Sequence, residues 1–136
     1  MKLDRLKKML ERHEGRRAFP YRDTVGKLTI GVGRNIEDVG LSADEIDLML
    51  SNDIQERYDA LKQFAWFRSL NEARQEAIVD ISFMGLGKLL EFKKMIAALS
   101  TGDYNKASIE LLDSRYATQV GKRAIEIAQI IKTGQY

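Results

Sequence analysis

Only one short stretch of the chain alternates with period two, the pattern of a strand with one buried face. It runs from Leu28 to Gly33, and a cluster of turn-forming residues, Asp23 to Lys27, comes directly before it. This order predicts a small antiparallel hairpin between Tyr21 and about Ile36. No other stretch has a strand pattern, so the rest of the fold is expected to be helical.

Apolar residues at helical spacing occupy most of the remaining chain. The first helix is expected to end near Glu14, where Gly15 can cap it. A Ser-x-x-Glu capping box at Ser42 begins a long helix. Further helices are predicted over Asn71 to Phe83, Leu89 to Leu99, Tyr104 to Leu112 and Val120 to Ile131. The expected class is α+β, mostly helical, with the strands segregated near the N-terminus.

Composition limits the chemistry. The 136 residues suit a single domain, and with no cysteine and one histidine the chain has no disulfide framework, thiolate zinc site or histidine cluster. No metal or cofactor is expected.

The net charge of +2 suits an acidic polymer as partner, but this charge is far weaker than the basic stripe of a nucleic-acid binder. No apolar run has the length of a signal sequence or a membrane span, so cytoplasmic synthesis without stable membrane association is expected.

Glu14 stands out among the carboxylates. It lies at the expected C-terminus of a helix, where the negative end of the helix dipole disfavours a carboxylate. The same dipole favours the protonated form, which a general acid needs near neutral pH. Structural networks also perturb carboxylates, so position alone does not make Glu14 catalytic.

Asp23 opens the turn of the hairpin, where aspartate is commonly a turn former. If the connection is centred on Gly26, Asp23 lies directly opposite Thr29, and the two side chains project from one face.

Alternation then places Gly31 and Gly33 on the same face as Thr29 and turns Ile30 and Val32 toward a core. A face with one hydroxyl and two glycines leaves space for a ligand against the backbone, although a bulge or tight bend also explains the glycines. Two carboxylates beside such a surface fit glycoside hydrolysis, in which one acid protonates the leaving oxygen and a carboxylate activates water.

These residues resemble the catalytic region of the T4-lysozyme-like phage endolysins, glycoside hydrolase family 24. The resemblance rests on Glu14-Gly15, Tyr21 to Thr24, Gly26 and Thr29 to Gly33, in which the Glu-x8-Asp-x5-Thr spacing is kept. It implies a lysozyme-like fold over 1–136, with a small β-containing lobe at about 15–42 and a helical lobe from about 60 that includes the N-terminal helix.

The resemblance also implies roles for single residues. Glu14 corresponds to the catalytic acid, Asp23 to the second carboxylate and Thr29 to the residue that positions water. A second similar segment, Ser114 to Ala124, implies that Gln119 lines the cleft and that Arg123 pairs with the catalytic glutamate.

Departures from the family occur in both expected lobes. Arg34 stands where many relatives have histidine, which removes a histidine-based ion pair. The segment from Ser82 to Gly87 is also one residue short and lacks a polar residue after the phenylalanine.

The expected activity is that of an inverting muramidase, which hydrolyses the β-1,4 bond between N-acetylmuramic acid and N-acetylglucosamine in bacterial peptidoglycan. A monomer made in the host cytoplasm is expected, reaching the cell wall after another protein opens the membrane. Three alternatives stay open: a lytic transglycosylase, a non-catalytic peptidoglycan-binding module and, more weakly, a helix-turn-helix DNA binder around Ser42.

Overall fold

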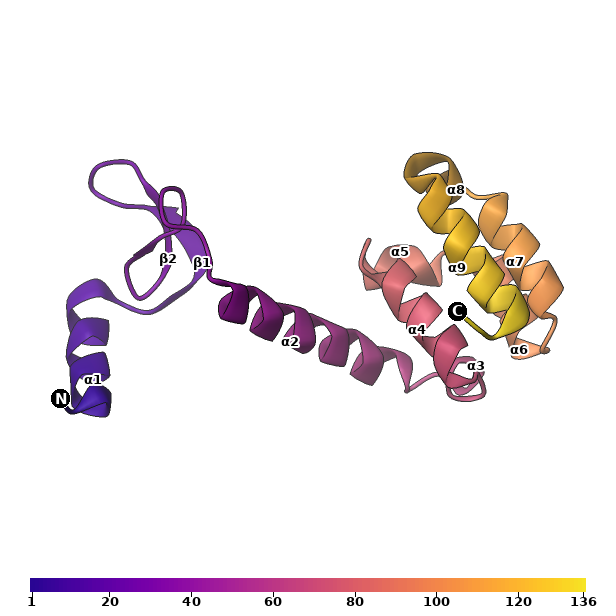
Figure 1. The fold of residues 1–136 in the computed structure, drawn as a ribbon, viewed down its shortest axis with the longest axis horizontal. Helices are drawn as coiled ribbons and strands as arrows, with labels where there is room; N and C mark the ends of the chain where they lie inside the picture. Colours follow the sequence, from indigo (N-terminus) through magenta and orange to yellow (C-terminus); the bar gives the residue numbers. More distant parts are fainter. The chain divides into compact units, whose positions relative to one another are not determined.

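The computed structural model describes residues 1–136 and contains nine helices and one three-stranded antiparallel sheet (Figure 1). The predicted α+β class, mostly helical with a small sheet near the N-terminus, is confirmed. The chain divides into two compact parts, Met1–Met49 and Leu50–Tyr136, whose boundary falls inside one long helix. A single catalytic domain over 1–136 stays a prediction.

The first helix, α1 (Leu3–Glu14), ends where predicted. Leu3, Leu6 and Leu10 recur on one side, and charged residues occupy the other side. The helix ends at Gly15, which adopts a φ of 79° and donates its N–H to the Glu11 carbonyl at 2.9 Å. Glycine fits this cap because it has no side chain to oppose a positive φ.

The sheet is larger than the predicted hairpin. Its strands are β1 (Arg17–Arg22), β2 (Leu28–Gly31) and β3 (Arg34–Asn35), in the order β1-β2-β3. The start predicted at Tyr21 is therefore too late, and the prediction missed a strand. β1 is an edge strand, and Pro20, which has no N–H to donate, is tolerated there. Apolar and polar residues do not alternate along β1, so its sequence has no strand pattern.

The predicted course of β2 beyond Gly31 is also wrong. Val32 and Gly33 form a turn into β3, and Gly31 and Gly33 have φ values of 69° and 68°. As a result Val32 is 37% exposed, whereas Thr29 is only 3% exposed. Ile30 and Val32 thus do not form the expected core face, and the tight bend is the correct explanation of these two glycines.

The long helix α2 (Ala43–Leu61) begins with the predicted capping box. Ser42 Oγ accepts from the Glu45 N–H at 3.2 Å, and a Glu45 carboxylate oxygen accepts from the Ser42 N–H at 2.8 Å. Glu45 also binds Arg34 through two hydrogen bonds of 2.8 and 2.7 Å. This Arg34–Glu45 ion pair ties β3 to the first turn of α2.

The second part is entirely helical. After α2 it contains α3 (Ala65–Arg68), α4 (Glu72–Ser82), α5 (Leu86–Leu90), α6 (Lys93–Ser100), α7 (Tyr104–Leu112), α8 (Arg115–Val120) and α9 (Lys122–Thr133). α7 packs along α9 and against α6, and α4 packs on α9 (Figure 1). Asn71 and Asp103 cap α4 and α7 by accepting from the third N–H of each helix, so both predicted starts are confirmed.

Two predicted helices are interrupted. The helix expected over Leu89 to Leu99 breaks after Leu90, where Phe92 leaves helical geometry and packs edge-on against Tyr116. The helix expected from Val120 starts instead at Lys122, since Gly121 has a φ of 57° and separates it from α8. Tertiary packing and one glycine thus override continuous apolar periodicity.

The core of the second part draws apolar side chains from all of its helices. It consists of Leu61, Phe67, Leu70, Ala77, Ile78, Val79, Ile81, Leu89, Met95, Ala98, Leu99, Ala107, Leu111, Tyr116, Ala124, Ile127, Ala128, Ile130 and Ile131. No helix of the protein combines the length and apolar composition that crossing a membrane requires.

Replacing Leu111 by alanine tests this core. Leu111 is fully buried on α7, so Leu111→Ala should lower the free energy of unfolding by about 2–5 kcal/mol. Ile109 lies on the same helix but is 64% exposed, and Ile109→Ala should change that free energy by less than about 0.5 kcal/mol. Urea denaturation measures both; equal losses would show that the inner face of α7 is misassigned.

The Arg34–Glu45 pair should make stability depend on pH. Hydrogen bonds from Arg34, and then from Ser42, lower the pKa of Glu45 from 4.5 to about 2. The pair therefore stabilises the fold fully above pH 4.5, and this contribution disappears as the pH falls toward 2, because the unfolded chain binds the proton first. Melting temperatures of wild type and Glu45→Gln should differ at neutral pH and converge near pH 2. A constant difference over that range would contradict the assignment.

Candidate active site

Glu14 is the last residue of α1, and its side chain lies against the turn between β2 and β3. A Cβ placed on Gly33 would meet Glu14 Oε2 at 3.0 Å and Glu14 Cδ and Cγ at 3.2 Å. Gly33 thus serves two purposes, since it takes a φ of 68° and leaves room for the carboxyl group. The bare backbone of this turn forms one wall beside Glu14.

Asp23 directly follows β1 and holds the loop that connects this strand to β2. Its Oδ1 accepts from the backbone N–H of Val25 at 3.0 Å and of Lys27 at 2.8 Å. The turn-former interpretation is therefore correct as geometry. It also fixes the carboxylate, because both bonds use Oδ1 and none of the described hydrogen bonds uses Oδ2.

The predicted pairing of Asp23 with Thr29 is wrong by two residues. Thr29 lies opposite Tyr21, and Asp23 lies opposite Lys27, whose carbonyl accepts from the Asp23 N–H at 2.9 Å. The loop is centred on Val25, because a three-residue connection places its left-handed residue, Gly26 with a φ of 86°, in the third position.

By the observed register, Thr29 nevertheless belongs to the same face of the hairpin as Asp23. Tyr21 and Asp23 are two residues apart, so the residue opposite Tyr21 projects from the face to which Asp23 belongs. The Thr29 hydroxyl donates to the Lys27 carbonyl at 2.9 Å. Thr29 is only 3% exposed, and none of the described hydrogen bonds donates to its hydroxyl oxygen.

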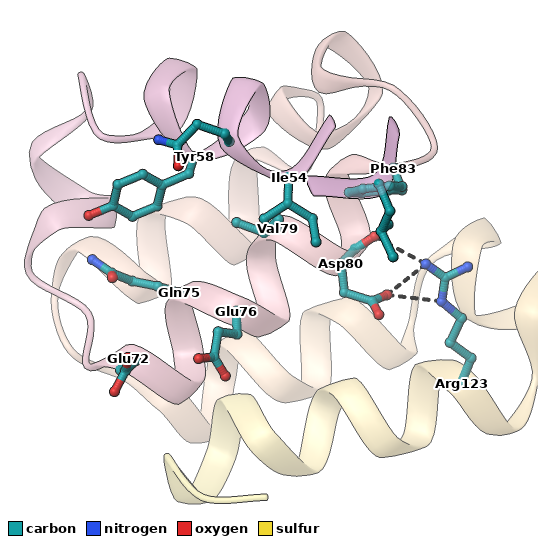
Figure 2. Close-up of a pocket in the computed structure, with 11 residues that line it drawn as sticks. Ile54, Tyr58, Glu72, Gln75, Glu76, Val79, Asp80, Phe83 and Arg123 are labelled. Atoms are coloured by element: carbon teal, nitrogen blue, oxygen red, sulfur yellow. Dashed lines mark hydrogen bonds and ion pairs between the residues drawn. The ribbon is translucent and has the colours of Figure 1, made fainter. Parts of the chain in front are cut away.

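The second part of the chain contains a pocket of about 600 Å³, lined by α2, α4 and α9 (Figure 2). Apolar side chains such as Ile54, Val79 and Phe83 form much of its wall. At one end Arg123 binds Asp80, with the shortest bond, Nη2 to Oδ1, at 2.6 Å. These hydrogen bonds raise the pKa of Arg123. None of Glu14, Asp23 and Thr29 lines this pocket.

A buried hydroxyl lies near the Arg123–Asp80 pair. Tyr116 is 5% exposed, and its Oη has no hydrogen-bond partner. Burial raises the pKa of Tyr116. The charge of Arg123 lowers this pKa, and the charge of Asp80 raises it. Sequence patterns did not single out Asp80 or Tyr116, because only the fold brings α4, α8 and α9 together.

The remaining predicted site residues are Gln119, Gly31 and Arg123. Gln119 is exposed on α8 and does not line the pocket. Gly31 ends β2, and no atom lies within 4 Å of where its Cβ would stand. Arg123 binds Asp80 in the second part, and its pairing with Glu14 stays a prediction. Nowhere do three or more His, Cys, Asp or Glu side chains form a group that could hold a metal ion.

Substituting Gly33 tests the contact with Glu14. Gly33→Ala should destabilise the fold by more than the roughly 1–2 kcal/mol of a left-handed alanine, because Glu14 must also move. Gly40 has nearly the same φ, 69°, with no neighbour near its Cβ position, so Gly40→Ala is the matched control. The ¹³C shift of the Glu14 carboxyl should change in the first variant only. A wild-type ¹³C shift of the Glu14 carboxyl in Gly33→Ala would show that the contact does not exist in solution.

Comparison with known proteins identifies the family of the chain. The Phage lysozyme family matches residues 11–128, which include Glu14, Asp23, Thr29 and Arg123. The pre-baseplate central spike protein Gp5 of Enterobacteria phage T4 is 29% identical over 93% of the chain, which spans 27% of that protein. The probable T4-type lysozyme 2 of Dictyostelium discoideum is 24% identical over 95% of the chain and 94% of its own length. The chain belongs to the phage lysozyme family.

Proposed function

We propose that the protein is a muramidase that hydrolyses the β-1,4 bond between N-acetylmuramic acid and N-acetylglucosamine in bacterial peptidoglycan. Membership of the phage lysozyme family supports a glycoside hydrolase in general. The observation that carries the proposal is the carboxyl group of Glu14 held against the bare turn at Gly33. Asp23 and Thr29 lie on the neighbouring hairpin at the family's spacing.

In this proposal Glu14 is the general acid. It protonates the glycosidic oxygen as the bond to the anomeric carbon breaks, so the leaving sugar departs as a neutral alcohol. The absence of a side chain on Gly33 lets the glycan approach the carboxyl group closely. Gly31 keeps the same stretch of backbone open.

Asp23 and Thr29 hold the attacking water. With Oδ1 of Asp23 bound by two N–H groups, Oδ2 is presented as the base that accepts a proton from water. The Thr29 hydroxyl donates to a carbonyl and can accept the second water hydrogen, which turns the lone pair of water toward the anomeric carbon. Attack from the side opposite the leaving group gives inversion.

Further roles follow from the family resemblance. Gln119 and Arg123 support the substrate or the acid, and the enzyme acts as a monomer without nucleic acid or a stable membrane partner. It is made in the host cytoplasm and meets peptidoglycan once the membrane is opened.

Glu14→Gln should leave the fold intact and lower the rate of cell-wall lysis by at least about 100-fold, because an amide cannot donate the proton. Clearing of a suspension of purified sacculi measures the rate. The neighbouring His13→Ala is the control and should lyse at nearly the wild-type rate. Substantial lysis by Glu14→Gln would show that another group is the acid.

Asp23→Asn separates the role of this residue as a base from its role in the turn. Asparagine keeps Oδ1 as acceptor for the Val25 and Lys27 N–H groups but loses the charge that activates water. The melting temperature should therefore stay near that of wild type, while lysis falls by at least about 100-fold. Unchanged lysis would favour a transglycosylase, which needs only the acid.

A further inference from the structure

A bulge in β1 brings two side chains of the hairpin together. Arg17 lies opposite Gly31 and Tyr21 lies opposite Thr29, so a step of four residues along β1 faces a step of only two along β2. Two residues of a regular strand cover about 7 Å, whereas four cover about 13 Å. The bulge thus shortens the distance between Arg17 and Tyr21 enough for their side chains to meet.

The guanidinium of Arg17 lies over the ring of Tyr21, with Cζ 4.5 Å from the ring centroid. This cation–π contact holds the charged group in place. A guanidinium has five N–H donors, and none of the described hydrogen bonds involves those of Arg17. Arg17 is also exposed, so an ordered group with its donors unused is accessible to a ligand.

Arg17 differs from the neighbouring cations, because it forms none of the described ion pairs. Every other lysine or arginine from residue 16 to residue 34 lies 2.7–3.5 Å from a carboxylate: Arg16 pairs with Glu11, Arg22 with Glu37, Lys27 with Asp38 and Arg34 with Glu45. The charge of Arg17 is therefore left without an acidic partner in a hairpin where such partners are the rule.

The Arg17–Tyr21 pair lies on the face of the hairpin that carries the proposed catalytic groups. Directly opposite residues project from one face, so Arg17 and Tyr21 share a face with Gly31 and Thr29. Asp23 belongs to this face by alternation from Tyr21. No atom lies within 4 Å of the position that a Cβ of Gly31 would take. The unpaired charge thus stands beside bare backbone, where a ligand has room to lie.

We propose that Arg17, held by Tyr21, binds a carboxylate carried by the N-acetylmuramic acid units of peptidoglycan. This sugar bears a lactyl group that ends either in a free carboxylate or in a short peptide with carboxylates of its own. Arginine binds a carboxylate through two parallel, charge-assisted hydrogen bonds. This inference rests on the proposed muramidase function, and it makes Arg17 a residue that selects peptidoglycan over glycans without carboxylates.

Binding of a soluble muropeptide to the full-length protein tests the inference. The probe is N-acetylglucosaminyl-N-acetylmuramic acid with its peptide, which contains no bond that a muramidase cleaves. Arg17→Ala should raise the Kd by about tenfold, because a charge-assisted pair is lost. Amidating the carboxylates of the probe should raise the wild-type Kd equally, and both changes together should add less than about twofold more. Additive increases, no increase from either change, or no binding by wild type would overturn the inference.

Arg16→Ala is the matched control. It removes the same charge from the adjacent position, but the Arg16 side chain is 78% exposed and already paired with Glu11. The Kd should therefore rise by less than about twofold, as for a screened surface charge. Equal increases in Arg16→Ala and Arg17→Ala would show general attraction between charges and would overturn the site.

Variants of Tyr21 test how Arg17 is held. Tyr21→Phe keeps the ring and should bind the muropeptide like wild type. Tyr21→Leu removes the ring over which the guanidinium lies and should weaken binding nearly as much as Arg17→Ala. A wild-type Kd in Tyr21→Leu would contradict the positioning role of Tyr21.

The same disaccharide without its peptide identifies the carboxylate. If Arg17→Ala weakens its binding as much as that of the muropeptide, the lactyl group is the ligand; if the effect disappears, the ligand is in the peptide.

Binding and lysis fail separately. A wild-type protein that lyses sacculi but binds the muropeptide no better than Arg17→Ala rejects this site alone. A wild-type protein that binds with the expected dependence on Arg17 but leaves sacculi intact rejects the hydrolase proposal and keeps the site.

Discussion

The contact between the Glu14 carboxyl group and the backbone at Gly33 is the constraint on which the candidate site depends. It needs a helix that ends at residue 14, a strand that stops at Gly31, and a turn residue with a positive φ and no side chain. If any of these changed, the carboxyl group would move from the hairpin that carries Asp23 and Thr29. The helix cap at Gly15, the loop at Gly26 and the turn at Gly33 therefore act together.

The same hairpin shows how a structural and a chemical role can be combined in one side chain. Asp23 closes the loop with one carboxylate oxygen and leaves the other without a described hydrogen bond. Thr29 donates to a carbonyl, and none of the described hydrogen bonds donates to its own oxygen. Groups that are oriented before the substrate arrives need little reorganisation during reaction, which is the main physical source of catalytic efficiency in sites of this kind.

Sequence patterns predicted the parts of the fold that depend on local signals. The end of α1 at Glu14 and the starts of α4 near Asn71 and of α7 at Tyr104 were predicted. The capping residues at these three ends are Gly15, Asn71 and Asp103. The edge strand β1 and the break after Leu90 were not predicted. An edge strand need not alternate, and the break depends on the packing of Phe92 against Tyr116. Local patterns cannot reveal such contacts between distant residues.

The candidate site was predictable to a similar extent. Spacing and family resemblance supplied Glu14, Asp23 and Thr29 as candidates. The error in the pairing register shows that a turn type cannot be predicted from the position of one glycine. Asp80 left no signal, since its partner Arg123 is 43 residues away in the chain. Arg34 was recognised as a departure from the family, yet its new partner Glu45 became visible only in the folded structure.

The central claim is that water, held by Asp23 and Thr29, attacks a glycosidic bond whose oxygen is protonated by Glu14. Mass spectrometry of peptidoglycan digested in H₂¹⁸O tests it most directly. The proposed mechanism predicts fragments that end in a reducing N-acetylmuramic acid and carry one ¹⁸O atom. Unlabelled anhydro fragments, or sacculi that bind the protein and release no fragments, would contradict it.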